Sequence, residues 1–129
     1  MDYAEIYTDE DDVSHFRDMS VDFTLSEVAP PALPIGASNF WAATEMGFLT
    51  VPSGWDGGWH QTPADGFIII LSGEIQVEVG DGEKRRFPSG SVYRHTDRKG
   101  PGHNSINLGS EDAVAVMVKF PDEEPDPEN

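Results

Sequence analysis

The chain contains no cysteine, and this absence excludes disulfide bonds, thiolate nucleophiles and cysteine-ligated zinc. Basic residues are scarce: 8 Lys and Arg stand against 24 Asp and Glu, for a formal net charge of −16. Nucleic acids and anionic membrane surfaces are bound by clusters of Lys and Arg, so we expect neither as a partner. No apolar run approaches the roughly 18 residues of a membrane-spanning helix, and the first residues are acidic where a secretory signal is basic. These absences predict a soluble, cytoplasmic protein.

The length of 129 residues fits a single domain with one core. The acidic residues gather at the two ends, because residues 1–12 hold six acids and residues 121–129 hold five, and neither segment has a basic residue. We therefore divide the chain into an acidic N-terminal segment and arm over residues 1–36, a β-barrel over residues 37–120, and an acidic, Pro-rich tail over residues 121–129. The tail is expected to be solubilising, with docking to a basic partner as the alternative.

The middle of the chain is a series of short strand patterns separated by Gly, Pro and Asp. The apolar run 67–71 has the length of a strand, and residues 74–79 alternate so that Ile75, Val77 and Val79 should face a core. Asp81 and Gly82 predict a hairpin turn, since this pair supplies a positive φ. Further strands are predicted over residues 21–25, 37–44, 46–51, 91–96, 103–108 and 113–120, with a connection over 29–34 and a short helix over 13–19. About eight strands with little helix predict an all-β jelly-roll barrel.

Two groups of residues in this region resemble the motifs of the cupin superfamily. Gly54 and His60 are separated by five residues, as in the first cupin motif, and Gly73 matches its final glycine. The second motif, Pro-x-Gly followed by His and, after three residues, Asn, is matched at Pro88, Gly90, His103 and Asn107, with a lengthened gap. The resemblance covers about residues 39–120 and implies a double-stranded β-helix, the cupin type of jelly roll. It also implies a homodimer, with the segment 13–35 as a candidate for an exchanged arm.

The chain departs from the cupin metal-binding pattern at two positions. Cupins of that pattern take two His and a Glu from the first motif and one His from the second, but Thr62 and Gly66 stand at the second His and the Glu places. His60 and His103 remain, and two imidazoles are too few to hold a divalent ion well. His95 is a candidate third ligand, or else a surface or hairpin-packing residue. A divalent Fe, Mn, Ni or Zn ion is therefore an open possibility.

Several other residues are candidates for the site, each with a simpler structural interpretation. His60, His103 and Tyr93 are the candidate catalytic groups; Tyr93 is a proton donor to the ligand or a core residue. Asp97 is expected to cap its loop before it would act as a base, and His15 is read as a surface residue. Arg94 could hold a substrate carboxylate with its planar guanidinium. The candidate substrate-binding residues are Trp59, Thr62, Arg94, Phe67 and Trp41.

Three functions are compatible with these residues. In the first, His60 and His103 perform acid–base chemistry on a small carbonyl-bearing metabolite, as in an isomerase, dehydratase, lyase or cyclase. In the second, a metal is held by His60, His103 and a third ligand such as His95, Gln61 or a carboxylate, for an oxygenase or Lewis-acid lyase. In the third, the barrel binds a small ligand without turning it over. All three require the two imidazoles to converge inside the barrel.

Overall fold

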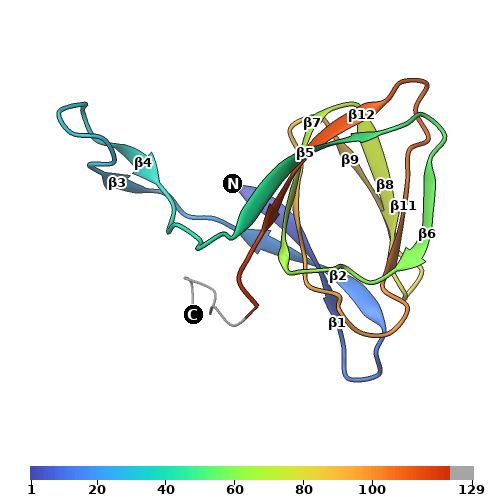
Figure 1. Ribbon diagram of the computed structural model, residues 1–129. Coiled ribbons are helices and arrows are strands. Elements are labelled where there is room, and N and C mark those ends of the chain that lie inside the picture. The colour runs from blue at the N-terminus through green and yellow to red at the C-terminus, as the bar shows by residue number, and fades with distance from the viewer. Residues whose placement is uncertain (123–129) are drawn as a thin grey trace.

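The computed structural model describes residues 1–122, and every regular element in this part of the chain is a β-strand (Figure 1). The strands form sheets of six, four and two strands. The acidic tail predicted over residues 121–129 lies almost wholly outside the described residues. Within residues 1–122 there is no helix long and apolar enough to cross a membrane.

The larger sheet supplies one wall of the barrel. Its strand order is β2-β1-β10-β7-β12-β5, and β1 runs parallel to β10 while the other neighbours are antiparallel. In chain order its strands are β1 (Asp2–Thr8), β2 (Ser14–Ser20), β5 (Glu45–Val51), β7 (Gly66–Ser72), β10 (Val92–His95) and β12 (Ala113–Lys119). Alternate residues of each strand face the opposite wall, as the pleat of a strand requires.

The smaller sheet supplies the opposite wall, in the order β6-β11-β8-β9. Its strands are β6 (Asp56–His60), β8 (Glu74–Glu78), β9 (Lys84–Pro88) and β11 (His103–Ile106). The core lies between the two sheets, where Ile6, Val77 and Val79 are fully buried. The fold is a jelly-roll β-barrel whose two sheets face each other without closing into one continuous sheet, as the sequence predicted for its class.

Several of the predicted elements are confirmed in detail. Ile75, Val77 and Val79 are buried, as the alternation over 74–79 predicted. The turn that follows is formed by the backbone N–H of Gly82, which donates to the carbonyl of Val79 at 3.0 Å, and Gly82 has a φ of 94°. Residues 29–34 lie between strands, as expected of a Pro-rich connection.

The N-terminal part of the chain differs from the prediction. The helix predicted over residues 13–19 is wrong, because Ser14–Ser20 forms β2, and β1 before it pairs with β10 in the middle of the chain. The strand predicted over 37–44 is also wrong, because β4 ends at Ala37 and β5 begins at Glu45. The sheet that forms the barrel wall thus begins at residue 2 and continues across the boundary drawn at residue 36.

A two-stranded hairpin, β3 (Thr24–Ser26) paired with β4 (Ile35–Ala37), projects away from the barrel on the side of β5 (Figure 1). It carries an unusual number of large apolar side chains in contact with solvent. The exposed apolar residues on this hairpin and its flanks are Phe23, Leu25, Val28, Leu33, Ile35 and Phe40. Leu33 is 85% exposed. We call this segment, residues 23–40, the projecting hairpin.

Candidate functional site

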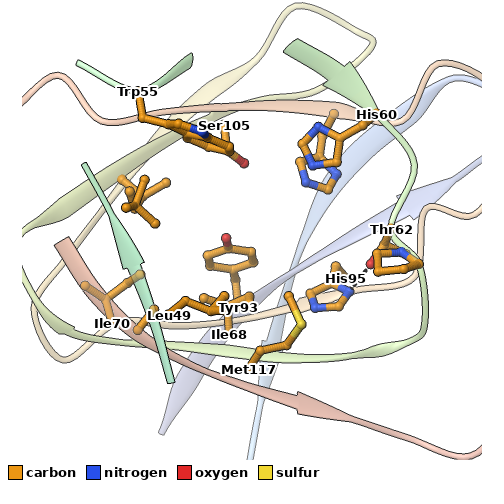
Figure 2. A pocket seen from close by; sticks show the side chains of 15 residues that line it. Leu49, Trp55, His60, Thr62, Ile68, Ile70, Tyr93, His95, Ser105 and Met117 are labelled. Carbon is orange, nitrogen blue, oxygen red and sulfur yellow. Dashed lines mark hydrogen bonds between the residues drawn. The ribbon is translucent and has the colours of Figure 1, made fainter. Parts of the chain in front are cut away.

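A cavity of about 130 Å³ lies between the two sheets and is partly open to solvent (Figure 2 shows the side chains that line it). Its walls are mainly aliphatic, and its polar groups are imidazoles and hydroxyls. None of the described residues that line it is Lys, Arg, Asp or Glu. The lining comprises Leu49, Val51, Trp55, His60, Thr62, Pro63, Ile68, Ile70, Ile75, Tyr93, His95, His103, Ser105, Ala115 and Met117.

His60 and His103 meet at one end of this cavity. The two residues are direct partners in the antiparallel pairing of β6 with β11, which places both side chains on the same face of the smaller sheet. Their ring centroids lie 4.6 Å apart, with the planes inclined by 58°. The long separation of these two residues in the sequence is therefore closed by the pairing of neighbouring strands.

The hydrogen bonds of these two rings determine which nitrogen carries the proton. The Nδ1–H of His60 donates to the carbonyl of Gly58 at 2.7 Å, and the Nδ1–H of His103 donates to Oδ2 of Asp97 at 2.5 Å. A carbonyl or a carboxylate only accepts, so Nδ1 is the protonated nitrogen in both rings. In the neutral form of each ring, Nε2 then carries a lone pair that can accept a proton.

Asp97 is the functional residue that the sequence undervalued. It is fully buried, its Oδ2 holds His103, and its Oδ1 has no hydrogen-bond partner among the described residues. The only signal in the sequence was a carboxylate six positions before His103, in a loop where a capping role was equally reasonable. A buried carboxylate behind an imidazole fixes the ring orientation and stabilises the imidazolium that forms when Nε2 takes a proton.

His95 lies beside this pair and is 3% exposed, so it is not the surface residue of the alternative interpretation. The hydroxyl of Thr62 donates to the carbonyl of Ala64 at 3.0 Å and is also hydrogen-bonded to Nδ1 of His95. Burial, and to a smaller extent the neighbouring His103, lower the pKa of His95 to about 4. His95 is therefore a neutral group at pH 7, and Thr62 holds its ring rather than standing free for a ligand.

Tyr93 and Ser105 add hydroxyls to the cavity, one from each wall (Figure 2). Both residues are buried. Burial raises the pKa of Tyr93, and the negative charge of Asp97 raises it further. The phenol stays protonated at neutral pH and can donate a hydrogen bond to an oxygen of a bound molecule.

Four residues predicted to bind substrate do not line the cavity, and strand alternation explains two of them. Trp59 precedes His60 on β6, so its side chain points to the other face, where it is 47% exposed. Arg94 lies between Tyr93 and His95 on β10 and points outward, with Nη1 3.8 Å from Oε1 of Glu5. Arg94 is therefore not placed to hold a carboxylate inside the barrel.

Phe67 and Trp41 belong to an aromatic cluster on the outer face of the larger sheet. Their rings meet edge to face, with centroids 5.3 Å apart. Phe67 makes similar contacts with Tyr3 at 5.5 Å and Phe120 at 5.2 Å. This cluster covers the sheet from outside, so these rings stabilise the barrel wall instead of lining the cavity.

The described residues do not form a complete donor set for a divalent metal. Within residues 1–122, no three or more side chains of His, Cys, Asp or Glu are grouped so as to hold an ion. Nδ1 of His60, of His103 and of His95 is engaged by a protein group, so Nε2 is the nitrogen that each ring could offer to an ion. Metal binding by these three residues stays a prediction that elemental analysis would test.

The fold and the cavity together define a class: a small jelly-roll barrel with a ligand-sized, imidazole-lined interior. The family model of the cupin domain matches residues 47–119, more than half of the chain. The chain therefore belongs to the cupin family. A comparison with curated proteins finds no significant match.

Similar solved structures come from several bacteria. A Cupin 2 conserved barrel domain protein from Salinispora arenicola is 22% identical, with a TM-score of 0.50 over 78% of this chain and 76% of that one. A cupin domain from Bordetella pertussis is 21% identical, with a TM-score of 0.48 over 66% of this chain and 99% of that one. A conserved protein of unknown function from Streptococcus pyogenes is 24% identical, with a TM-score of 0.45 over 59% of this chain. This chain spans 64% of that protein's length.

Proposed function

We propose that this protein is an enzyme that moves a proton on a small carbonyl-bearing molecule, as an isomerase, dehydratase or lyase does. One observation carries the proposal: His103, backed by the buried carboxylate of Asp97, faces His60 at the polar end of a cavity of ligand size. Imidazole is suited to this work because it both accepts and returns protons near neutral pH.

The residues can be given roles in such a reaction. Nε2 of His103 takes a proton from the carbon next to the carbonyl, and the electron pair moves onto the carbonyl oxygen to give an enolate. Asp97 stabilises the imidazolium that results. The hydroxyl of Tyr93 donates a hydrogen bond to the oxygen as its negative charge develops. His103, or His60 in its protonated form, returns a proton to a carbon of the enolate, so no oxidant or reductant is needed.

Proton exchange in D₂O tests this proposal without knowledge of the natural substrate. Cyclohexanone and 2-cyclohexen-1-one are incubated with the protein, and loss of the protons next to the carbonyl is followed by ¹H NMR. We expect the protein to accelerate exchange, and His103→Gln, His60→Gln and Asp97→Asn each to slow it by about 10²-fold or more. His15→Gln is the matched control, because His15 lies outside the cavity.

The outcomes separate catalysis from simple binding. An unchanged exchange rate in His103→Gln would contradict the assigned base. Binding of either ketone with no acceleration of exchange would show that the barrel is a binding module.

We also propose that the protein is a homodimer joined through the projecting hairpin. A lone two-stranded hairpin is marginal in water, and large exposed apolar groups such as Leu25 and Leu33 are characteristic of an interface. A second copy is the favoured occupant because the chain also exposes Met46 and Phe48 on β5, the edge strand of the larger sheet. In a two-fold pair, each hairpin can cover the β5 edge of the other copy, so both apolar surfaces are buried at once.

The charge distribution supports the same pairing. Residues 21–44 contain only two acids, Asp22 and Glu27, and no base, although the whole chain carries a net charge of −16. Like charges repel across an interface, so the weakly charged segment is the part of this acidic surface that can approach a second copy at least cost.

A further inference from the structure

We infer that the cavity selects an uncharged molecule about as large as one six-membered ring and excludes carboxylates, phosphates and amines. The inference concerns the same site as the proposed function and rests on that proposal for the use of the site in catalysis. It also replaces the carboxylate-bearing substrate that Arg94 suggested in the sequence.

The size follows from the volume and from the stiffness of the walls. A cavity of about 130 Å³ is close to the roughly 150 Å³ apolar cavity that accommodates benzene in a protein core. The floor is formed by buried aliphatic side chains on both sheets, among them Ile68, Ile70, Ile75 and Ala115. Interiors of this kind are close-packed and give way little, so a second fused ring would have to displace these side chains or extend through the mouth, away from the walls.

The expectation that the ligand is uncharged follows from the residues that line the cavity. Among the described lining residues no ammonium, guanidinium or carboxylate faces the cavity. The nearest guanidinium along the chain, that of Arg94, points to the outer face and lies beside Glu5. A charged ligand would leave water and meet no Lys, Arg, Asp or Glu side chain among these residues, so a fixed opposite charge would not compensate for its lost hydration.

The polar groups that are present reinforce this selection. Asp97 accepts the Nδ1–H of His103 from behind the ring and does not itself line the cavity, so it disfavours a carboxylate there and offers no direct ion pair to an amine. His95 offers no compensating positive charge, since burial holds its pKa far below neutrality. Tyr93 and Ser105 contribute hydroxyls, which bind a neutral carbonyl or hydroxyl group without a charge of their own.

Matched probes test the inference by binding alone. Benzyl alcohol, benzoate and benzylammonium have nearly the same size and differ in charge, and 1-naphthalenemethanol adds one ring to the first. Each is titrated into the full chain while isoleucine methyl signals are followed by NMR. We expect benzyl alcohol to bind at least about tenfold more tightly than either ion. We expect 1-naphthalenemethanol to bind about tenfold or more weakly than benzyl alcohol. Equal or tighter binding of benzoate or benzylammonium would overturn the inference.

Two substitutions locate the binding in the cavity. Ala115→Leu fills part of the cavity and should weaken the binding of benzyl alcohol at least about tenfold. Met117→Lys places an ammonium at the cavity wall and should strengthen the binding of benzoate about tenfold. This second variant keeps the test decisive if Ala115→Leu fails to fold. Thr50→Lys adds the same charge on β5 outside the cavity and should leave benzoate unchanged. A benzoate gain of the same size in Thr50→Lys would show that the ion binds elsewhere.

Failure of this inference can be told apart from failure of the proposed function. If benzyl alcohol binds tightly but exchange on cyclohexanone is not catalysed, the inference of an uncharged ligand stands and the proposed enzymatic function is wrong. If exchange is catalysed on 4-oxocyclohexanecarboxylate but not on cyclohexanone, the proposed enzymatic function stands and the inference of an uncharged ligand is wrong.

Discussion

Single residues in this barrel acquire their roles from the groups that hold them. The chain has four histidines, and the structure gives them different partners: Gly58 for His60, Thr62 for His95, Asp97 for His103, and two carboxylates for His15. Only the first three line the cavity. Because a partner decides which nitrogen carries the proton and whether the ring is charged, four identical side chains can serve different purposes.

His15 illustrates a role that lies outside the cavity. Its Nε2 is 2.5 Å from Oδ2 of Asp9, in the turn between β1 and β2, and its Nδ1 is 2.7 Å from Oδ2 of Asp81, in the turn between β8 and β9. Two carboxylate partners require both ring nitrogens to donate, so the ring is an imidazolium. The hydrogen bond to Asp9, followed by that to Asp81, raises the pKa of His15 above its ordinary value of 6.5.

The contacts of His15 with Asp9 and Asp81, which we call the His15 clamp, predict that the stability of the fold depends on pH. Because the folded pKa of His15 is raised, its contribution is complete below about pH 6.5 and is lost as the pH rises through the folded pKa. The pKa of Asp9 is lowered, chiefly by the hydrogen bond to His15, so the contribution of that carboxylate is lost only in stronger acid. We expect His15→Gln to lower the thermal unfolding midpoint at pH 6 and to have a smaller effect at pH 9. An equal loss at the two pH values would contradict the clamp.

At the scale of the strand, alternation predicted some elements and failed for others. β8 was predicted because its apolar residues alternate with Glu and Gln, as on a sheet with one face in water. β1 was missed because residues 1–12 were interpreted only as an acidic segment. In the structure Glu5 is 3% exposed, and its carboxylate pairs with Arg17 and lies 3.8 Å from Arg94. A local sequence pattern cannot predict that an acidic residue is buried when its partners come from other strands.

Gly66 shows how strand packing also decides the chemistry. It stands at the Glu place of the cupin motif, and a Cβ at this position would lie 2.0 Å from the carbonyl oxygen of Val118 on β12. The two strands approach too closely for any side chain. The Glu ligand of the usual metal set therefore has no room here in the present arrangement of β7 and β12.

The same contact gives a stability prediction. Gly66→Ala should lower the free energy of unfolding by about 1–3 kcal/mol, because β7 and β12 must separate to admit the methyl group. Gly47→Ala is the matched control, since a Cβ on Gly47 in β5 meets nothing within 4 Å. Urea denaturation measures both variants. Equal stability of the two would show that the strands yield at no cost.

At the scale of the whole molecule, the proposed dimer makes the projecting hairpin testable. Leu33→Asp places a charge on the most exposed apolar residue of the hairpin, where it has little contact with the barrel. We expect the wild-type chain to have twice the mass of a monomer in light scattering, and Leu33→Asp to weaken the dimer at least about tenfold. Leu108→Asp is the control, because Leu108 is also exposed but lies in the turn between β11 and β12. A monomeric wild-type protein would contradict the pairing.

The sequence by itself determined the fold class, the family and the pair His60 and His103, because alternation and glycine spacing are local patterns that follow from backbone geometry. The tertiary structure alone decided that Asp97 stands behind His103, that His95 is buried and neutral, and that Arg94, Phe67 and Trp41 face outward. Each of these depends on which strand lies beside which and in what register. A shift of one residue moves a side chain to the other face of the sheet, and that difference is set by contacts between distant segments.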